Sequence, residues 1–163
     1  MIAQGKKIKK FKQGFFVICD NIRSLQNVGS IFRTSDAFGI DKAYLCGITG
    51  APSEKMARKA ALGAEEWIPF EKHWKTWRVI DKLKAEGINV VALEKTKNSR
   101  DIAKFKPKFP LALVVGNEVK GVSRSVLKRA DIVVHIPMYG KKESLNVAVA
   151  YGIAVAKITE HRK

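Results

Sequence analysis

Polar side chains that suit substrate binding or catalysis recur in pairs behind three apolar runs of this sequence. The pairs are Asn27 with Arg33, Asn117 with Glu118, and Ser144 with Asn146. Amide, hydroxyl and guanidinium groups are hydrogen-bonding groups that can hold a polar ligand. Each pair also has a structural explanation, in which Asn27 and Ser144 cap helices and Asn117 closes a turn. Their recurrence behind successive strands of a basic chain favours a common site.

Several common catalytic sites are absent from the sequence. The segment from Gly116 to Ser123 spaces two glycines like a phosphate-binding loop, but Val122 stands where such a loop requires lysine. No G-x-G-x-x-G motif follows a predicted strand, and no G-x-S-x-G motif occurs. The three histidines have no cysteine or histidine at ligand spacing, so we expect no metal. These features argue against simple hydrolase, kinase and dinucleotide-binding functions.

The charge balance points to a polyanionic partner. The chain has 31 Lys+Arg against 15 Asp+Glu, a formal net charge of +16. Nucleic acid is the usual partner of such a surface, and no lysine-rich amphipathic helix with an aromatic face suggests a membrane partner. The sequence has no apolar run long enough to span a bilayer and no secretory signal, and Cys19 and Cys46 fit reduced core residues. We therefore predict a cytoplasmic protein that binds nucleic acid.

Short apolar runs alternate with helical patterns along the chain, which predicts an α/β protein with a mostly parallel sheet flanked by helices. The expected strands are Phe15–Asp20, Ala43–Gly50, Glu66–Phe70, Ile88–Leu93, Leu111–Val115 and Ile132–Ile136. The expected helices lie around Asn27–Phe38, Lys55–Ala64, Trp74–Ala85, Ser123–Ala130 and Ser144–Ala156. Residues 1–14 form a basic arm, and residues 15–163 form a single domain.

Two helical segments carry specific expectations. At 100° per residue, Arg33 falls on the side of its helix opposite the apolar stripe, so it does not point into the core. The last helix, predicted to start at Ser144, is apolar on every side, and such a helix is expected to be packed by several neighbours. Lys120, Arg124 and Lys128 are spaced by four and are expected to share a helix face.

Three segments resemble the three motifs of the SPOUT class of RNA methyltransferases, in its TrmH (SpoU) branch. Asn27–Arg33 matches N-x-G-x-x-x-R, Gly116–Ser123 matches G-N-E-x-x-G-[VL]-S, and Ile136–Val147 matches I-P-M-x-G-x-x-x-S-L-N-V. The motifs occur in order at appropriate separations, and the resemblance covers nearly all of residues 15–158. Three motifs in register are specific evidence, where one would be weak.

The resemblance implies a deep trefoil knot in the C-terminal segments, a homodimer packed through the terminal helices, and methyl transfer from S-adenosylmethionine to a ribose 2′-hydroxyl of tRNA or rRNA. The cofactor-binding residues it implies are Leu93, Gly116, Asn117, Ile136, Met138, Leu145 and Asn146. The catalytic residues it implies are Arg33, Asn27, Glu118, Ser144 and Asn146.

The role of Arg33 has two interpretations. Guanidinium stays protonated to roughly pH 12 or beyond, so Arg33 suits bidentate phosphate binding that orients the 2′-oxygen. Proton transfer to Arg33, as the family mechanism proposes, is the other. A knotted RNA-binding module without methyltransferase activity is the alternative function. RNA contacts are expected from the basic arm, from the lysine-rich loop Lys95–Lys108 and from the face carrying Lys120.

Overall fold

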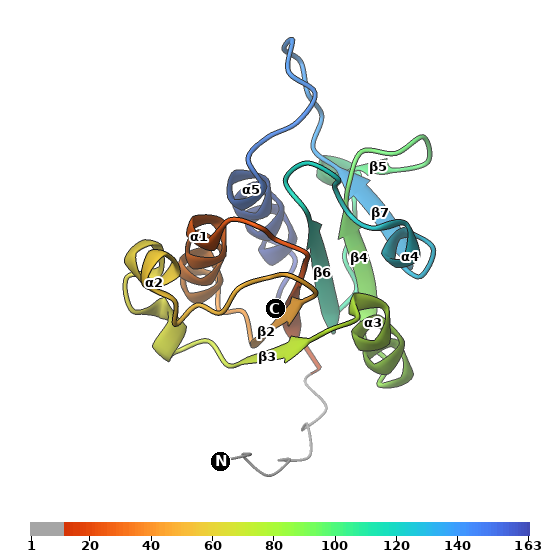
Figure 1. Ribbon diagram of the computed structural model, residues 1–163. Helices are drawn as coiled ribbons and strands as arrows, with labels where there is room; N and C mark the ends of the chain where they lie inside the picture. The colour runs from red at the N-terminus through yellow and green to blue at the C-terminus, as the bar shows by residue number, and fades with distance from the viewer. Residues whose placement is uncertain (1–11) are drawn as a thin grey trace.

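A seven-stranded, entirely parallel sheet forms the centre of the molecule (Figure 1). The computed structural model describes residues 12–163, so most of the predicted basic arm lies outside the described residues. The strands are β1 Phe15–Asp20, β2 Lys42–Cys46, β3 Phe70–His73, β4 Asn89–Leu93, β5 Arg100–Asp101, β6 Leu111–Gly116 and β7 Ile132–His135, in the spatial order β3-β2-β1-β6-β4-β7-β5. The prediction of an α/β fold with a parallel sheet is confirmed.

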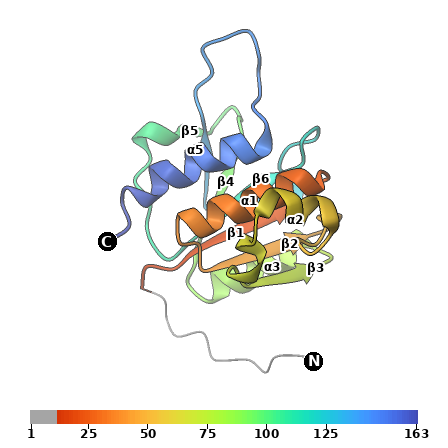
Figure 2. The ribbon, with the colours of Figure 1, turned by 90° about the vertical axis from the view of Figure 1, so that its left-hand side faces the viewer.

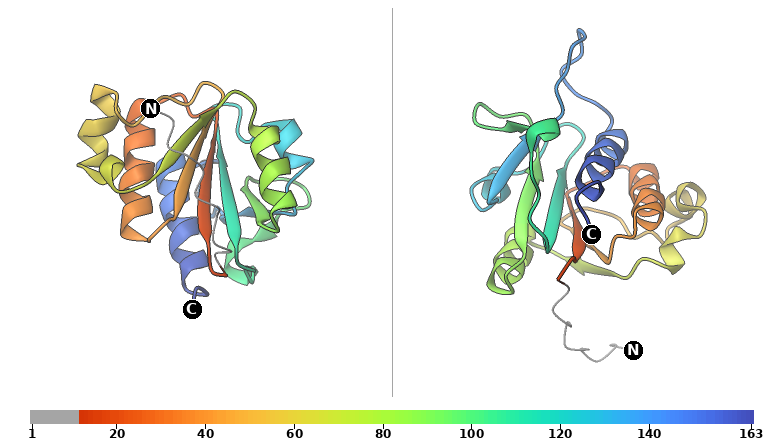
Figure 3. Two further views of the ribbon diagram at one scale, coloured as in Figure 1. Left: turned by 90° about the horizontal axis from the view of Figure 1, so that it is seen from below. Right: turned by 180° about the vertical axis from the view of Figure 1, so that it is seen from behind.

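Helices cover both faces of this sheet (Figures 2 and 3). The helices are α1 Leu25–Ala37, α2 Lys55–Ala61, α3 Thr76–Ala85, α4 Arg124–Leu127 and α5 Val147–Thr159, with 3₁₀ turns η1 Ala64–Glu66 and η2 Ile102–Lys104. α1 and α5 pack on one face, with α2 against the outer side of α1, while α3 and α4 pack on the other. No helix within residues 12–163 has the length and apolar character needed to cross a membrane.

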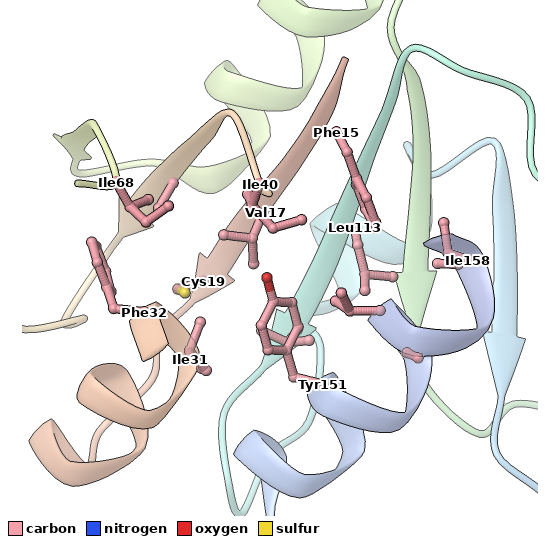
Figure 4. Close-up of a cluster of buried hydrophobic side chains, with 14 of the residues drawn as sticks. Phe15, Val17, Cys19, Ile31, Phe32, Ile40, Ile68, Leu113, Tyr151 and Ile158 are labelled. Atoms are coloured by element: carbon pink, nitrogen blue, oxygen red, sulfur yellow. The ribbon is translucent and has the colours of Figure 1, made fainter. Parts of the chain in front are cut away.

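The central strands are buried because both faces are covered. All six residues of β1 are buried, and its side chains alternate between two core clusters. Phe15 and Val17 join the cluster under α1 and α5, where the Tyr151 hydroxyl points inward and hydrogen-bonds Ser35 Oγ at 2.8 Å (Figure 4). Cys19 belongs to the same cluster, and neither cysteine forms a disulfide, in keeping with the sequence prediction.

α1 lies close to α2 because a glycine stands at the contact. A Cβ built on Gly29 would come within 2.1 Å of the Ala57 carbonyl oxygen. The glycine of the first motif therefore allows two helices to approach each other. Ser24 caps α1, since its Oγ accepts a hydrogen bond from Asn27 N–H at 3.2 Å. Asn27 is thus not the cap of this helix, and its side chain is free for other contacts.

Several predicted element boundaries differ from the structure. The predicted strand Glu66–Phe70 is instead η1 followed by β3, because Leu62 and Gly63 have positive φ and turn the chain. α4 ends at Leu127 and not at Ala130, because the chain turns toward Asp131. The Asp131 N–H donates to the Val90 carbonyl oxygen, and the Asp131 carboxylate accepts from Val90 N–H. Ser123 makes no side-chain capping bond, and Lys120 precedes α4, so the three cations share no helix face.

The last helix also differs from the prediction. α5 begins at Val147 and not at Ser144, because Asn146 is its N-cap: Asn146 Oδ1 accepts hydrogen bonds from Ala148 N–H and Val149 N–H. Within the single chain this helix is not packed on every side. Val149 and Ile153 are 53% and 38% exposed, because only the opposite side of the helix reaches the core.

Candidate functional site

A cavity of about 400 Å³ opens at the carboxyl ends of β4, β6 and β7. Ligands of open parallel sheets bind at this edge, and the volume lies within the usual range for small-molecule sites. The cavity is closed on one side by the segment between β7 and α5, which projects beyond the sheet (Figures 1 and 2). Residues predicted to bind the cofactor that line it are Leu93, Gly116, Asn117, Ile136, Met138 and Leu145.

The loop after β6 folds back on itself and presents backbone to the cavity. Asn117 and Gly121 exchange two backbone hydrogen bonds, of 3.0 and 2.8 Å. A Cβ on Gly116 would lie 2.2 Å from Val122 N, so a larger residue does not fit there. Asn117 Oδ1 accepts from the N–H groups of Val119 and Lys120, which closes the turn. The side chain of Asn117 therefore shapes the loop, as its turn interpretation predicts.

Glu118, Asn27 and Asn146 form one hydrogen-bonded row across the three motifs. Asn27 Nδ2 donates to Glu118 Oε1 at 3.0 Å, and Asn27 Oδ1 accepts from Asn146 Nδ2 at 3.1 Å. Glu118 also accepts from the backbone N–H groups of Arg23 and Ser24, at 2.9 and 3.0 Å. The Asn27 amide is thereby fixed in one orientation, and the start of α1 is tied to the loop after β6.

The protonation state of Glu118 follows from these bonds. Burial by itself would raise the pKa of the Glu118 carboxyl group, but hydrogen bonds from Asn27 and from the backbone of Arg23 and Ser24 favour the charged form and leave the pKa below its usual value. A carboxylate that is ionised and already accepts three hydrogen bonds is a poor proton acceptor. The geometry therefore favours a positioning role for Glu118.

Ser144 and Asn146 differ in how they relate to the cavity. Ser144 lines the cavity and is exposed, and it lies two residues before the cap of α5. Asn146 does not line the cavity, and its amide is used in capping α5 and in bonding Asn27. Ser144 thus belongs to the part of the third motif that lines the cavity, and Asn146 belongs to the scaffold beside it.

Arg33 lies apart from this arrangement. It is exposed on α1, as the helix geometry predicts, and it does not line the cavity. Within residues 12–163 its side chain makes no hydrogen bond or ion pair. α1 runs beside α5 (Figure 2), and Thr34 contacts α5 at Gly152. Arg33 therefore faces solvent on a helix that packs beside α5.

Two acidic residues that shape the site were missed by sequence reasoning. Glu94 follows β4 and lines the cavity, and its carboxylate accepts from Val122 N–H at 2.9 Å. Asp20 ends β1, is 1% exposed, and accepts from Ser123 N–H and the Thr76 hydroxyl. Both hold the loop after β6 from outside its motif. The only feature of the sequence that could have marked them as site residues is that both stand at the carboxyl ends of predicted strands.

Metal coordination finds no support in the described part of the chain. No group of three or more His, Cys, Asp or Glu side chains there is placed to hold an ion. Acidic side chains near the cavity instead accept hydrogen bonds from backbone N–H groups, as Glu94 does from Lys95.

Comparisons with known proteins show which family the chain resembles. The profile of the SpoU rRNA Methylase family matches residues 14–156. A putative TrmH family tRNA/rRNA methyltransferase of Bacillus subtilis, YacO, is 35% identical over 159 residues, which cover 94% of this chain and 61% of that protein. The tRNA (guanosine(18)-2′-O)-methyltransferase of Aquifex aeolicus is 32% identical over 156 residues, covering 96% of this chain and 74% of that protein.

A solved structure shows the same fold. The SpoU methyltransferase AviRb of Streptomyces viridochromogenes, in complex with AdoMet, superposes with a TM-score of 0.86 at 26% identity. The superposition covers 93% of this chain and 61% of that one. The chain therefore spans about three fifths of the length of the Bacillus relative and of AviRb.

Proposed function

The chain belongs to the SpoU rRNA Methylase family, and we propose that it transfers a methyl group from S-adenosylmethionine to a ribose 2′-hydroxyl of tRNA or rRNA. The observation that best supports this proposal is that the three motifs meet at one edge of the sheet. There the hydrogen-bonded row from Glu118 through Asn27 to Asn146 lies beside the cavity. The net charge of +16 supports an RNA substrate. The Aquifex relative is named for ribose 2′-O-methylation of tRNA, which supports this reaction type.

The cavity suits S-adenosylmethionine. Its apolar lining by Leu93, Ile136 and Met138 suits an adenine ring, and the close approach of the loops at Gly116 leaves backbone groups to bind the polar parts. Leu145 and Ser144 line the side formed by the third motif. When bound there, the cofactor supplies an electrophilic methyl group on a positively charged sulfur. AviRb, a family member with this fold, was crystallised with AdoMet.

The catalytic role of Arg33 is proposed to depend on a homodimer. Leu145, Val149 and Ile153 form an exposed apolar stripe with a spacing of four residues, and α1, which carries Arg33, runs beside it. Burying this stripe against a second copy is favourable, at about 25 cal/mol per Å² of apolar surface. Such a dimer brings Arg33 of one protomer toward the partner's cavity, where its guanidinium binds substrate phosphate and orients the 2′-oxygen.

The chemistry asked of the chain is positioning and proton removal. Ser144 and the fixed amide of Asn27 are placed to orient the target nucleotide, while Asn146 supports Asn27. Arg33 is proposed to bind the substrate phosphate and so orient the 2′-oxygen, and it can accept the 2′-hydroxyl proton only in its neutral guanidine form. The trefoil knot and the cytoplasmic location remain predictions of the family resemblance and of the composition.

The test is incubation of the protein with S-adenosylmethionine labelled in the methyl group and total RNA, followed by digestion to nucleosides. We expect label in 2′-O-methylated nucleosides, and label in methylated bases contradicts the proposed reaction. Calorimetry with S-adenosylmethionine alone separates the alternative of an inactive RNA-binding module, which predicts no cofactor binding.

Replacement of Arg33 tests its role. Arg33→Lys is expected to reduce turnover by about 100-fold, because lysine cannot bind phosphate bidentately, while cofactor affinity stays unchanged. Arg58→Lys, at an exposed arginine of α2, is the matched control. Turnover of Arg33→Lys equal to that of Arg58→Lys contradicts the assignment.

A further inference from the structure

A rim of exposed apolar side chains leads from the cavity along the carboxyl ends of the strands. Val119, Ile48 and Trp74 are 85%, 64% and 89% exposed. They follow β6, β2 and β3, and in the sheet the carboxyl ends of β6, β1, β2 and β3 succeed one another (Figure 1). Single exposed apolar residues are ordinary, but three along one edge that begins at a cavity mark an interaction surface.

The backbone of this rim is continuous and fixed. Asn117 Nδ2 donates to the Asn21 carbonyl oxygen at 2.8 Å, and Asn21 Oδ1 accepts from Ile48 N–H at 3.2 Å. Gly47 N–H then donates to the His73 carbonyl oxygen at 2.9 Å, one residue before Trp74. A Cβ on Gly47 would come within 2.0 Å of Asn21 Oδ1, so this link requires glycine. The apolar side chains therefore stand on a rigid support that starts at the cavity.

The free charges along the rim are positive. Its exposed cations are Arg23, Lys75 and Lys120. None of them forms an ion pair within residues 12–163. The nearby carboxylates are engaged: Asp20 and Glu118 accept hydrogen bonds from the scaffold, and Glu71 pairs with Lys42 and His73. A partner of this rim must therefore be anionic and must offer flat apolar surface.

Single-stranded RNA has both properties. Its phosphates pair with lysine and arginine, and its unpaired bases stack on aromatic side chains. Trp74 stands between basic residues in the segment Lys72-His73-Trp74-Lys75, and its indole ring is almost fully exposed. We infer that the rim binds single-stranded RNA flanking the methylated nucleotide, with one unpaired base stacked on Trp74 and phosphates bound by Arg23, Lys75 and Lys120. The choice of RNA rests on the proposed function.

A matched pair of tryptophans makes the inference testable. Trp67 is 73% exposed and precedes β3, whereas Trp74 follows it, so the two indoles lie at opposite ends of one strand. The full chain, without cofactor, is titrated with a labelled oligo(A) on the order of 15 nucleotides long, while anisotropy and intrinsic tryptophan fluorescence are recorded. Trp74→Ala is expected to weaken binding by about 5- to 150-fold and to abolish the fluorescence quenching. Trp67→Ala keeps both within twofold.

Two further variants define the contact. Trp74→Phe retains most of the affinity, because a phenyl ring also stacks on a base. Lys75→Ala lowers the slope of log K against log salt by about 0.7, the loss of one phosphate contact. A blunt RNA duplex of equal length binds wild type and Trp74→Ala alike, since its bases are not free to stack.

Three results overturn the inference. In the first, Trp74→Ala and Trp67→Ala bind the oligonucleotide with equal affinity, and in the second, Trp74→Ala loses as much affinity for the duplex as for the oligonucleotide. In the third, Trp74→Ala changes the oligomeric state, which would make the rim a contact between copies of the chain. The melting temperature of each variant checks that its fold is intact. Trp74-dependent binding in a protein that transfers no methyl group supports the rim and contradicts the proposed function instead. If the protein transfers a methyl group but its RNA binding does not depend on Trp74, the proposed function is supported and the inference about the rim is contradicted.

Discussion

Asp20 is the carboxylate that holds three segments together at the end of β1. It is 1% exposed and accepts hydrogen bonds from Thr76 Oγ1 at 2.6 Å, from Ser123 N–H at 2.8 Å and from Asn21 Nδ2 at 3.1 Å. Through Ser123 it fixes the loop that presents backbone to the cavity. Replacement of Asp20 should therefore affect both folding stability and cofactor binding.

Asp20→Ala removes the acceptor of three donors, of which the Ser123 N–H and the Thr76 hydroxyl determine most of the expected loss. Each such group costs about 1–3 kcal/mol when buried. Thr76 is 6% exposed, and the Ser123 bond is only partly buried, so the expected loss of unfolding free energy is about 2–4 kcal/mol. For a domain of this size, that loss lowers the melting temperature by about 4–16 °C.

Asp20→Asn should be milder. The Asn oxygen still accepts from Ser123 N–H, and its amide group can donate to the Thr76 hydroxyl, so the expected loss is about 1 kcal/mol. Asp81→Ala is the control, because Asp81 is half exposed and pairs with Arg129, and such pairs contribute less than about 1 kcal/mol.

Urea denaturation gives the stabilities, and calorimetry gives the affinity for S-adenosylmethionine. The expected order of destabilisation is Asp20→Ala, then Asp20→Asn, then Asp81→Ala, with cofactor affinity reduced in Asp20→Ala even at temperatures where it is fully folded. If Asp20→Ala is as stable as Asp81→Ala, or is destabilised while its cofactor affinity is unchanged, the carboxylate does not hold the loop as described.

Three further predictions concern other contacts. The pKa of Glu118 is lower in the folded protein than its ordinary value, so its contribution to stability is present above the unfolded-state value of about 4.3 and is lost as pH falls through the folded-state value. The difference in unfolding free energy between wild type and Glu118→Gln, measured by urea denaturation, should therefore shrink between pH 7 and pH 3. A constant difference argues against the hydrogen bonds that Glu118 accepts from Asn27 and from the start of α1. Gly29→Ala should lower the unfolding free energy by about 1–3 kcal/mol, because the added Cβ meets the Ala57 carbonyl oxygen. The control Gly152→Ala, whose Cβ would lie 3.9 Å from the nearest side-chain atom, should be neutral or stabilising by about 0.5–1 kcal/mol. Equal effects of the two substitutions would refute the close contact of α1 and α2. Val149→Lys should convert the proposed dimer to a monomer in sedimentation experiments, while Met56→Lys, at an exposed apolar residue of α2, should not; a dimer in both variants excludes the α5 stripe as the interface.

The sequence predicted best the strands that are buried on both faces of the sheet. β1, β4 and β6 read as uninterrupted apolar runs because helices cover both sides of the sheet, so their positions could be predicted closely. α5 was misjudged for a related reason: an apolar sequence does not show which side of a helix reaches the core. Val149 and Ile153 remain exposed in the single chain.

The site could be predicted as a set of residues but not as an arrangement. The motifs supplied most of the cavity lining, yet the direction of each side chain depends on contacts between distant segments. Asn117 and Glu118 turn into the scaffold, where Glu118 bonds residues more than 90 positions away. Glu94 and Asp20 lie outside the motifs, and Arg33 lies within a motif but does not line the cavity, which helix periodicity does not reveal.

The loop after β6 separates two tasks within six residues. Asn117, Glu118 and the two glycines set its shape, whereas the side chains of Val119 and Lys120 point to solvent and only their N–H groups take part in the turn. Both residues line the entrance of the cavity, so substitutions at these two positions keep the backbone hydrogen bonds that shape the loop while changing the chemistry displayed at that entrance. A protein built in this way can diverge in its proposed RNA target, by drift or by directed evolution, while the loop that shapes the proposed cofactor site keeps its hydrogen bonds.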